Sequence, residues 1–425
     1  MWPLGQGARL TLCPGDGCPS VPGTLYDVFL AIDLFILYTL PKSGGVGKPR
    51  PERKMNALAR QGMAATFFCI AAVFVPGTVV AAPGSAPAKP AATGASSTTP
   101  VHRRRPILID PAKDDVATFD DPVVRDTVVE ALGHEDGGVV VVDPNSGRIL
   151  SAVNQPLVFG TDYIPCSTIK PVIAVAALNE GILTRDSMLK VSRRRYMNLT
   201  EALAHSNNTF FESLGSQMGF ETVTKWAREF GLGETVGRDI PQERPGEVPG
   251  VPPEHGGVAR MSSFGEGFKI TPLQLAGVAS TLANGGTLYY LQYPRTDEER
   301  RNFAPLVHRK LEVEHLLPDV REGMLAAVLY GTAKRAFDPG GDEILGKTGT
   351  CSDDGRRLGW YASYSNPEHP HLVVVVLLRG YRHRINGPTA SAVAGKIYHR
   401  LHALNYSVPA VANEEKSTLI SVGSH

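Results

Sequence analysis

The sequence predicts an α/β protein of the α+β type: an antiparallel five-stranded sheet flanked by helices, together with a mostly helical lobe. Three observations predict this fold class. Segments rich in β-branched residues lie near both ends of the region 106–408, short connections join the strands within each group, and residues 160–335 have mostly helical and loop patterns. Because short connections favour antiparallel pairing, we expect both groups to join one sheet that carries the terminal helices.

The first predicted helix precedes the first two strands. Apolar residues recur at helical spacing over residues 121–132, and Asp121 stands as an N-cap before Pro122. A β-hairpin follows, with strands Val139–Val142 and Arg148–Val153 joined by a turn rich in Asp, Pro, Asn and Gly. These strands supply the N-terminal part of the predicted sheet.

The other three strands and the last helix lie near the C-terminal end. Strands are predicted at Ile344–Cys351, Leu358–Tyr364 and Leu372–Leu378, with short connections between them. Helical spacing then extends over Pro388–Leu404. We therefore expect the chain to close its sheet with a C-terminal helix packed on it.

Composition excludes several classes of protein. The chain has 425 residues, 42% of them hydrophobic, which is enough for a large core, and its net charge is +1. This balance gives no electrostatic footprint for nucleic acid, so we expect no nucleic-acid partner. Histidine and cysteine do not cluster at metal-ligand spacing, and we expect neither a metal nor a cofactor.

One apolar segment, Met63–Ala82, indicates the compartment. It carries no charged residue and follows Arg53, Lys54 and Arg60. Such a segment is a signal peptide or a single membrane anchor, with its basic end inside the cell and the following residues exported. Pro83 disfavours cleavage directly before it, so we favour an uncleaved anchor. A buried core helix fits less well, because a linker rich in Pro, Ala, Ser and Thr follows.

This segment divides the chain. The first residues contain acidic side chains within an apolar stretch, and we interpret them as an extension upstream of the true start codon. The expected divisions are an N-terminal extension (1–54), a signal or anchor segment (55–82), a flexible linker (83–105), the folded domain (106–408) and a tail (409–425).

Ser167 and Lys170 form the first candidate catalytic pair. Residues three apart on a helix share a face, so the lysine amine can lie beside the serine hydroxyl and act as its base. A helix that begins here places Ser167 at its positive end, where backbone N–H groups can hold an oxyanion. A second copy of this spacing, Ser187 to Lys190, leads into the basic run 193–195, and we interpret it as a solvated linker.

The segment Ser206-Asn207-Asn208 is the second candidate. A hydroxyl and a carboxamide stand two residues apart where a helical pattern breaks. Ser206 can relay a proton and Asn208 can hold a substrate amide. Taken alone, this segment is equally typical of a polar loop or a helix cap.

The third candidate is Lys347-Thr348-Gly349-Thr350, on the predicted strand Ile344–Cys351. Alternation places Lys347 and Gly349 on one face of the strand, and Thr348 and Thr350 on the other. A lysine here can neutralise a carboxylate, a threonine hydroxyl can bind it, and Gly349 leaves the strand surface open to a ligand backbone. In isolation, the segment is also typical of an ordinary edge strand.

In this order and spacing, the three segments resemble the signature of the penicillin-binding protein transpeptidases, which is S-x-x-K, then S-x-N, then K-T-G. The resemblance covers about residues 121–404. Four longer segments are similar to parts of that family: IPCSTIKPVIAVAALNEG, FGLGETVGRDIPQERPGEVPG, FGEGFKITPLQLAGVASTLANGGT and KTGTCSDDGRRLGWYASY.

The resemblance implies a serine acyltransferase. Ser167 would attack a D-Ala-D-Ala stem peptide of peptidoglycan, with Lys170 as general base, kept neutral by burial and by Lys347. Ser206 would relay the proton to the leaving amine, and Asn208 would hold the donor peptide. An amine of a second stem peptide would then take the acyl group, and a β-lactam would leave the serine acylated.

The same resemblance implies the substrate contacts. Lys347, Thr348 and Thr350 would bind the terminal carboxylate beside the open surface at Gly349. The N–H groups of Ser167 and Thr350 would form the oxyanion hole. The expected partners are stem peptides, β-lactams as covalent inhibitors, the cytoplasmic membrane through one segment, and cell-wall synthesis proteins. The catalytic domain would be periplasmic, or secreted if the signal is cleaved.

The sequence departs from the family pattern in three places. Cys166 stands where the family usually has glycine, and the stretch between Ser167 and Ser206 is short. The linker also leaves no room for a glycosyltransferase or pedestal domain before residue 106. We therefore expect a bare catalytic domain on a tether.

Three alternatives stay open at this point. A D,D-carboxypeptidase or a serine β-lactamase would pass the same acyl group to water. The sequence shows no clear carboxylate motif for that step, and class D β-lactamases usually carry a valine-type residue where Asn208 stands. A β-lactam sensor domain would be acylated without turnover, but such receptors usually have several membrane spans.

The exported part would contain two cysteines, Cys166 beside the nucleophile and Cys351 beside Thr350. The implied oxyanion hole brings their neighbours together, and an oxidising compartment would permit a disulfide. Strand alternation, however, points Cys351 away from the face that Thr350 presents. The sequence therefore favours two small buried thiols, with the disulfide as the alternative.

Overall fold

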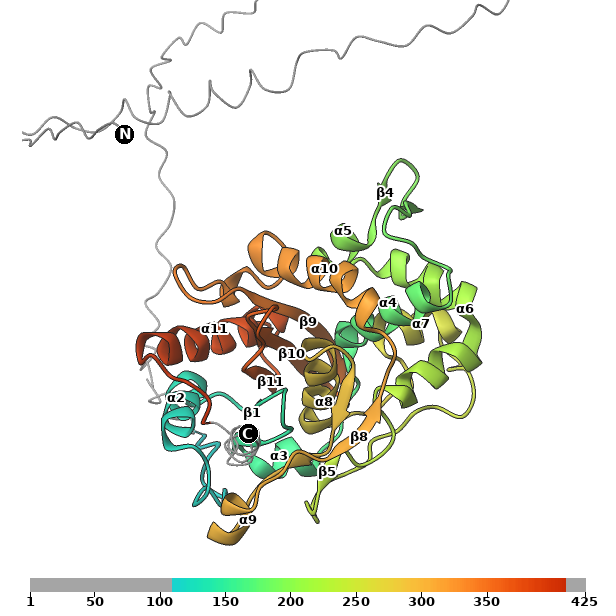
Figure 1. The fold of residues 1–425 in the computed structure, drawn as a ribbon. Coiled ribbons are helices and arrows are strands. Elements are labelled where there is room, and N and C mark those ends of the chain that lie inside the picture. Colours follow the sequence, from blue (N-terminus) through green and yellow to red (C-terminus); the bar gives the residue numbers. More distant parts are fainter. Residues whose placement is uncertain (1–108, 410–425) are drawn as a thin grey trace, which may run out of the picture. The chain divides into compact units, whose positions relative to one another are not determined.

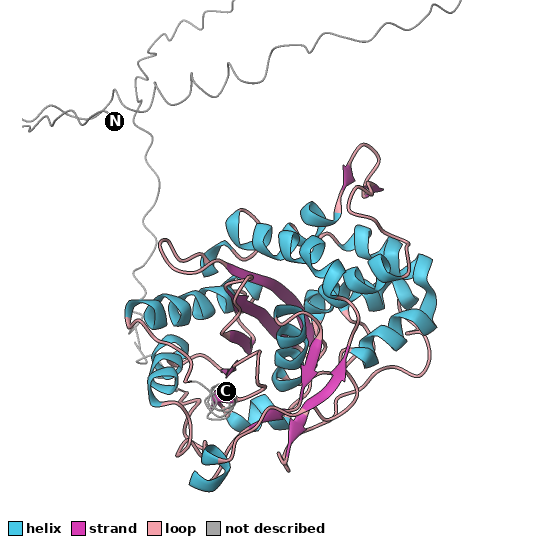
Figure 2. Ribbon diagram, viewed as in Figure 1, coloured by secondary structure: helices cyan, strands magenta, loops and turns pink. Residues whose placement is uncertain are grey.

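A computed structural model describes residues 109–409 and confirms the predicted fold class, a five-stranded antiparallel sheet with many helices (Figures 1 and 2). The extension, the apolar segment 63–82 and the linker 83–105 lie outside the described residues, as does the tail from residue 410. The strand order is β2-β1-β11-β10-β9. The bounds of these strands are β1 (Gly137–Val142), β2 (Ile149–Val153), β9 (Ile344–Asp353), β10 (Arg356–Ser365) and β11 (Val373–Gly380).

Helices make up most of the remaining regular secondary structure (Figure 2). The α-helices are α2 (Pro122–Leu132), α3 (Gln155–Gly160), α4 (Lys170–Asn179), α5 (Leu199–Ala204), α6 (Asn208–Glu229), α7 (Gly257–Phe264), α8 (Pro272–Ala283), α9 (Asp297–Arg301), α10 (Leu317–Leu329) and α11 (Gly387–Ala403). The 3-10 turns are η1 (Cys166–Ile169), η2 (Glu314–Leu316) and η3 (Lys334–Ala336). The middle region also contains three two-stranded sheets that the sequence patterns did not indicate. They pair β3 (Leu189–Lys190) with β4 (Tyr196–Met197), β5 (Gly237–Arg238) with β7 (Leu291–Gln292), and β6 (Thr287–Tyr289) with β8 (Val307–Lys310).

The two ends of the folded region meet in the centre of the sheet. Strand β1 pairs with β11 over its whole length, with Val139 opposite Val376 and Val142 opposite Val373. Both strands are continuous apolar runs because both faces of the sheet are covered. Helices α2 and α11 cover one face, and α8 with the helical lobe covers the other (Figure 1).

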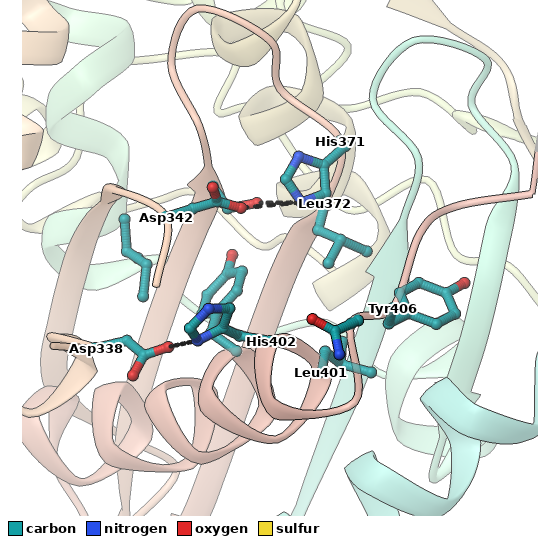
Figure 3. Close-up of a pocket in the computed structure, with 11 residues that line it drawn as sticks. Asp338, Asp342, His371, Leu372, Leu401, His402 and Tyr406 are labelled. Carbon is teal, nitrogen blue, oxygen red and sulfur yellow. Dashed lines mark hydrogen bonds and ion pairs between the residues drawn. The ribbon is translucent and has the colours of Figure 1, made fainter. Parts of the chain in front are cut away.

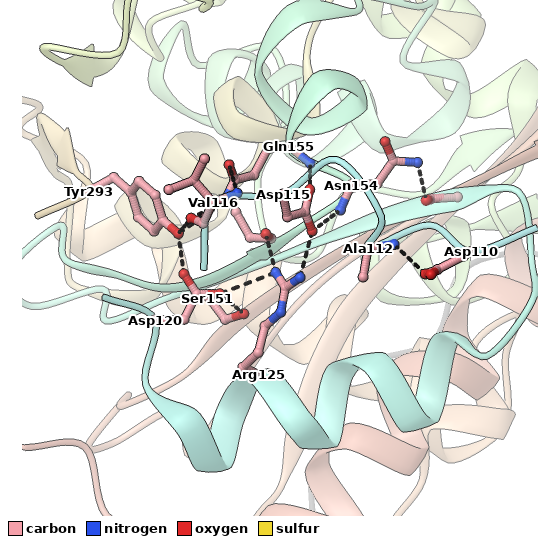
Figure 4. A network of polar contacts seen from close by, with 12 residues as sticks. Asp110, Ala112, Asp115, Val116, Asp120, Arg125, Ser151, Asn154, Gln155 and Tyr293 are labelled. Atoms are coloured by element: carbon pink, nitrogen blue, oxygen red, sulfur yellow. Dashed lines mark hydrogen bonds and ion pairs between the residues drawn. The ribbon is translucent and has the colours of Figure 1, made fainter. Parts of the chain in front are cut away.

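The entry into the domain is fixed by a polar network (Figure 4). Arg125 on α2 pairs with Asp115 at 2.8 Å and with Asp120 at 3.3 Å, and the backbone N–H of Gln155 donates to Asp115. The hydroxyl of Tyr293 donates to Asp120, whose pKa is raised by burial. Asp121 also caps α2 as predicted. These contacts tie residues 115–121 to the edge of the sheet.

The edge position of β9 determines where a ligand can approach. In the sheet that the structure describes, β9 pairs with β10 on one side and has no strand on the other. The turn η1 packs against β9 and against α4 and α7, and α6 packs on those two helices. Between residues 109 and 409 there is also no helix whose length and apolar character would let it cross a membrane.

Candidate active site

Ser167 lies in the 3-10 turn η1, directly before α4. Its side chain is 8% exposed, and the α4 segment that follows is buried almost throughout. The turn begins after Pro165, and Cys166 adopts a φ of +52°, a left-handed conformation that glycine adopts most easily. A glycine at residue 166 would adopt this conformation without strain.

Lys170 is fully buried and lies at the centre of the cluster. Its Nζ is 2.9 Å from Ser167 Oγ and 3.1 Å from Ser206 Oγ. It is also 2.9 Å from the backbone oxygen of Ser206 and 2.7 Å from Asn208 Oδ1. The last two atoms can only accept hydrogen bonds, whereas the two hydroxyls can donate. A neutral amine therefore donates to both acceptors and leaves its lone pair for the Ser167 and Ser206 hydroxyls.

The break between α5 and α6 presents Ser206 and Asn208 to this amine. Ser206 adopts a φ of +55°, and Asn207 caps α6 by accepting a hydrogen bond of 2.9 Å from the backbone N–H of Phe210. Asn208 is then the first residue of α6. The segment 206–208 is thus a helix cap, and its conformation directs the side chains of Ser206 and Asn208 toward Lys170.

Lys347 reaches the cluster from β9. Its side chain is 1% exposed, and Nζ donates to Ser206 Oγ at 2.8 Å and to the backbone oxygen of Thr348 at 3.0 Å. Gly349 lies on the same strand face, against the nucleophile turn. A Cβ at Gly349 would lie 3.0 Å from the Pro165 backbone oxygen and 3.2 Å from Cys166 Cβ. Glycine is therefore what permits β9 to approach Ser167 so closely.

Thr348 and Thr350 point to the other face of β9, as alternation predicts. Thr348 is buried, and its hydroxyl pairs with the Thr332 hydroxyl at 2.6 Å. Thr350 is exposed, and its Oγ1 accepts a hydrogen bond of 2.8 Å from the Gly387 N–H at the start of α11. Of the predicted set, five side chains are connected by hydrogen bonds through Lys170 and Ser206, whereas the two threonine hydroxyls lie apart from them; the five are Ser167, Lys170, Ser206, Asn208 and Lys347.

Burial lowers the pKa of both lysines, because it disfavours the charged ammonium form. Burial, and then the charge of Lys347, lower the pKa of Lys170 well below its ordinary value, and Glu212 opposes that shift. Burial lowers the pKa of Lys347 to about 7. Lys170 can therefore be neutral and act as a base while Lys347 carries part of its charge.

The expectation of two free thiols is wrong, because Cys166 and Cys351 form a disulfide, with their Cα atoms 5.7 Å apart. The alternation argument chose the wrong face of the strand. The face that packs against η1 carries Lys347 and Gly349 rather than Thr350, and Cys351 shares that face. The bond therefore connects the residue before the nucleophile to the strand beside it.

The structure adds two residues that the sequence analysis did not single out, Glu212 and Ser263. Glu212 lies on α6 one turn after Asn208, and it accepts a hydrogen bond of 3.3 Å from Ser263 Oγ. The backbone oxygen of Ser263 lies 3.5 Å from Ser167 Oγ. The four-residue spacing from Asn208 to Glu212 is the sequence signal that could have indicated this carboxylate.

The second serine–lysine copy does not enter the cluster. Ser187 Oγ contacts Thr184, and Lys190 is exposed on the short strand β3. A separate cavity of about 100 Å³ is lined by Asp338, Asp342, His371 and His402, among others (Figure 3). None of the predicted site residues lines it; the His402–Asp338 pair connects the end of α11 to a loop, and the His371–Asp342 pair connects two loops. Within residues 109–409 no acidic, histidine or cysteine cluster is arranged to hold a metal ion.

Comparison with known proteins places this fold and this cluster in one family. Residues 137–401 match the penicillin binding protein transpeptidase domain. The chain is 28% identical over 321 residues to Stage V sporulation protein D of Bacillus subtilis, covering 63% of this chain and 49% of that protein. It is 25% identical over 330 residues to peptidoglycan D,D-transpeptidase FtsI of Escherichia coli, covering 67% of this chain and 54% of FtsI. The chain thus spans about half the length of these relatives.

Solved structures show the same fold. The transpeptidase domain of Burkholderia pseudomallei penicillin-binding protein 3 superposes with a TM-score of 0.58 at 20% identity, covering 68% of this chain and 96% of that one. A D,D-transpeptidase domain from Eggerthella lenta gives a TM-score of 0.56 at 21% identity, covering 67% and 81%. The chain belongs to the penicillin-binding protein transpeptidase domain family.

Proposed function

We propose that this chain is a peptidoglycan D,D-transpeptidase whose nucleophile is Ser167. The observation that carries the proposal is the buried amine of Lys170, which lies within hydrogen-bonding distance of both the Ser167 and the Ser206 hydroxyls. One amine between two hydroxyls can take a proton from the first and deliver it through the second. The names of the relatives, among them peptidoglycan D,D-transpeptidases, support the same reaction.

In the acylation half-reaction, neutral Lys170 takes the proton of Ser167, and Oγ attacks the carbonyl carbon of the D-Ala-D-Ala bond. The N–H groups of Ser167 and Thr350 hold the resulting oxyanion. Lys170 then returns its proton through the Ser206 hydroxyl to the leaving nitrogen. The C–N bond breaks, D-alanine leaves, and an ester at Ser167 remains.

In the second half-reaction, the amine of another stem peptide attacks this ester. Its proton passes through Ser206 and Lys170 to the oxygen of Ser167, which leaves as a hydroxyl. The new amide is the cross-link. A β-lactam enters the first half-reaction only, because its leaving nitrogen stays attached within the opened ring and blocks the incoming amine.

The free edge of β9 supports the proposed substrate orientation. An extended peptide can add to an exposed strand edge through backbone hydrogen bonds. Asn208 uses its Oδ1 on Lys170, which leaves its amide N–H groups for the donor peptide. The proposed contact of the terminal carboxylate is the Lys347 ammonium, on the face of β9 that meets η1, whereas the Thr350 hydroxyl lies on the opposite face and accepts from Gly387.

We propose further that the catalytic domain works outside the cytoplasmic membrane, tethered through residues 63–82. The disulfide supports this location, since such bonds persist in oxidising compartments. The proposed partners are stem peptides, β-lactams and other cell-wall synthesis proteins.

Mass spectrometry of the full chain after exposure to benzylpenicillin tests the proposal. We expect one added penicilloyl group on the peptide that contains Ser167, stable over many minutes. Incubation with a D-Ala-D-Ala thioester donor and a stem-peptide amine should then give mainly the aminolysis product. A mainly hydrolytic outcome would instead indicate a D,D-carboxypeptidase or β-lactamase. If penicillin acylates the protein but no peptide donor is converted to product, the result would indicate a sensor domain.

A further inference from the structure

Helix α6 presents more than Asn208 to the reaction centre. Asn208 and Glu212 are four residues apart and therefore lie on one face of the helix. Between them, the ring of Phe211 lies 5.5 Å from Lys170 Nζ. The first turn of α6 is thus packed directly against the buried amine, and Glu212 completes that turn.

The Glu212 carboxylate is held in place from α7. Ser263 Oγ donates to Glu212 Oε1 at 3.3 Å, while the backbone oxygen of Ser263 faces Ser167 Oγ at 3.5 Å. The two helices are in close contact, since a Cβ at Gly215 would lie 2.1 Å from Ser262 Oγ. The carboxylate therefore belongs to a rigid layer that also touches the nucleophile.

Two charged groups act on Lys170 from the elements around it. Lys347 on β9 disfavours the ammonium form, and Glu212 on α6 favours it, so that Glu212 raises the pKa of Lys170 against the larger effect of burial. Other ionisable groups on the surrounding elements are paired with partners other than Lys170. At the end of α4 and on α5 and α7 these pairs are Glu180 with Trp226, Glu201 with His205 and Tyr330, and Arg260 with Glu266. On α10 they are Asp319 and Glu322 with Arg185, and Arg321 with the carbonyls of Leu282 and Ala283. Glu314 and His315 on η2 are exposed.

We propose that Glu212 is a positioning residue of the acylation step: its carboxylate, held by the Ser263 hydroxyl, is the counter-charge for the ammonium that forms when Lys170 takes the proton of Ser167. This inference rests on the proposed function, in which Lys170 is the base. The proton moves from Ser167 Oγ to Lys170 Nζ, and Glu212 itself gains no proton. It offsets a positive charge that otherwise arises in a buried site beside Lys347.

Removal of this charge has two opposite consequences. Without Glu212 the Lys170 ammonium is less stable, so Lys170 remains neutral down to a lower pH. The acid limb of the acylation profile, which is the fall in rate as Lys170 becomes protonated, therefore moves to lower pH. The same change makes Lys170 a weaker base, so the maximal rate falls. Loss of a nearby opposite charge typically shifts a pKa by about one unit, so we expect a limb shift of about one pH unit and a rate loss of about three- to tenfold.

The test uses the full chain and its second-order rate of acylation by benzylpenicillin between pH 5 and pH 9. The Glu212→Gln variant keeps the acceptor for Ser263 and removes the charge. Glu212→Asp retains the charge and should keep the acid limb near its wild-type position. Glu221→Gln removes an exposed carboxylate from the same helix, and is the matched control for net charge. Ser263→Ala removes the hydroxyl that holds the Glu212 carboxylate, and should move the acid limb part of the way toward its position in Glu212→Gln.

A downward shift of the limb in Glu212→Gln together with a lower maximum, both absent in Glu221→Gln, supports the inference. A uniform loss of rate with an unmoved limb overturns it, because that result describes a packing role alone. If Glu212→Gln does not fold, an unmoved limb in Ser263→Ala overturns it in the same way. Wild-type protein that benzylpenicillin does not acylate at any pH would instead contradict the proposed function.

Discussion

Cys166 and Cys351 form a disulfide between the residue that precedes Ser167 and the strand that lies beside it. The two cysteines are 185 residues apart in sequence, and their bond crosses from η1 to β9 next to Gly349. The separation between Ser167 and the edge of the sheet is therefore fixed by a covalent bond as well as by packing.

Loss of this bond should lower stability. A disulfide that closes a loop of this length restricts the unfolded chain, and removal of a native disulfide typically costs about 2–5 kcal/mol. We expect the free energy of unfolding of Cys166→Gly/Cys351→Ser to fall by about that amount, measured by denaturant titration. Glycine is used at residue 166 because its φ is positive. An equal free energy of unfolding for the oxidised wild type and for the wild type after reduction and alkylation would contradict this prediction.

Ser167 and Ser187 provide a matched pair for the nucleophile. Ser167→Ala should abolish labelling by a fluorescent penicillin, because it removes the hydroxyl beside Lys170. Ser187→Ala should label like the wild type, because that hydroxyl contacts Thr184 instead. Gel fluorescence with a folding check by circular dichroism measures both. Labelling that survives in folded Ser167→Ala would move the nucleophile elsewhere.

The pKa of Lys347 predicts the basic limb of the acylation profile. Burial lowers this pKa to about 7, so Lys347 is charged below pH 7 and loses its charge as the pH rises through that value. The attraction for a penicillin carboxylate is then lost, and the second-order acylation rate should decline above about pH 7, roughly tenfold per pH unit at most. Stopped-flow or quenched labelling between pH 6 and pH 9 measures this decline.

The Lys347→Ala variant is the control for that profile. It should acylate more slowly at pH 6, by about 1.5–3 kcal/mol in the activation free energy, as expected for a lost charged contact. Its rate should also be nearly independent of pH between 7 and 9. A wild-type profile that stays level to pH 9 would show that Lys347 does not bind the carboxylate.

Gly349→Ala should separate the strand from the nucleophile. The new Cβ would lie 3.0 Å from the Pro165 backbone oxygen, which cannot move without shifting η1. We expect the free energy of unfolding to fall by about 1–3 kcal/mol, measured by thermal melts. Penicillin labelling should fall by more than this loss of stability explains. Gly250→Ala, where the added Cβ meets nothing within 4 Å, is the matched control. Normal labelling by Gly349→Ala would contradict this account of the strand.

The strands of the main sheet could be predicted from the sequence because their signals are local. The valine runs at β1 and β11 and the turn after Val142 indicate strands without reference to the rest of the chain. Asp121 before Pro122 likewise predicts a capped helix, which the structure confirms. The position of β11 between β1 and β10 has no local signal, because it depends on contacts between distant residues.

The site could be predicted in part for the same reason. Ser167 with Lys170, and Ser206 with Asn208, are short motifs whose internal spacing already brings the side chains together. Which face of β9 meets the nucleophile depends instead on how Pro165 and Cys166 pack on Gly349. The sequence analysis chose the wrong face and so disfavoured the disulfide. Glu212 was missed because its contact is with Ser263, on a helix whose position the sequence does not give.

The pairing of β1 with β11 also has a consequence for biosynthesis. The residues of the proposed reaction all precede residue 351, yet β11 begins only at Val373. A growing chain that has reached residue 360 contains the nucleophile, the base and both other motifs, but β1 and β10 have no strand between them. Such long-range pairing is slow to form and must wait for the last segments. We therefore expect the proposed acyltransfer centre to form only after β11 has been made, and a premature stop before Val373 to remove activity without touching a proposed catalytic codon.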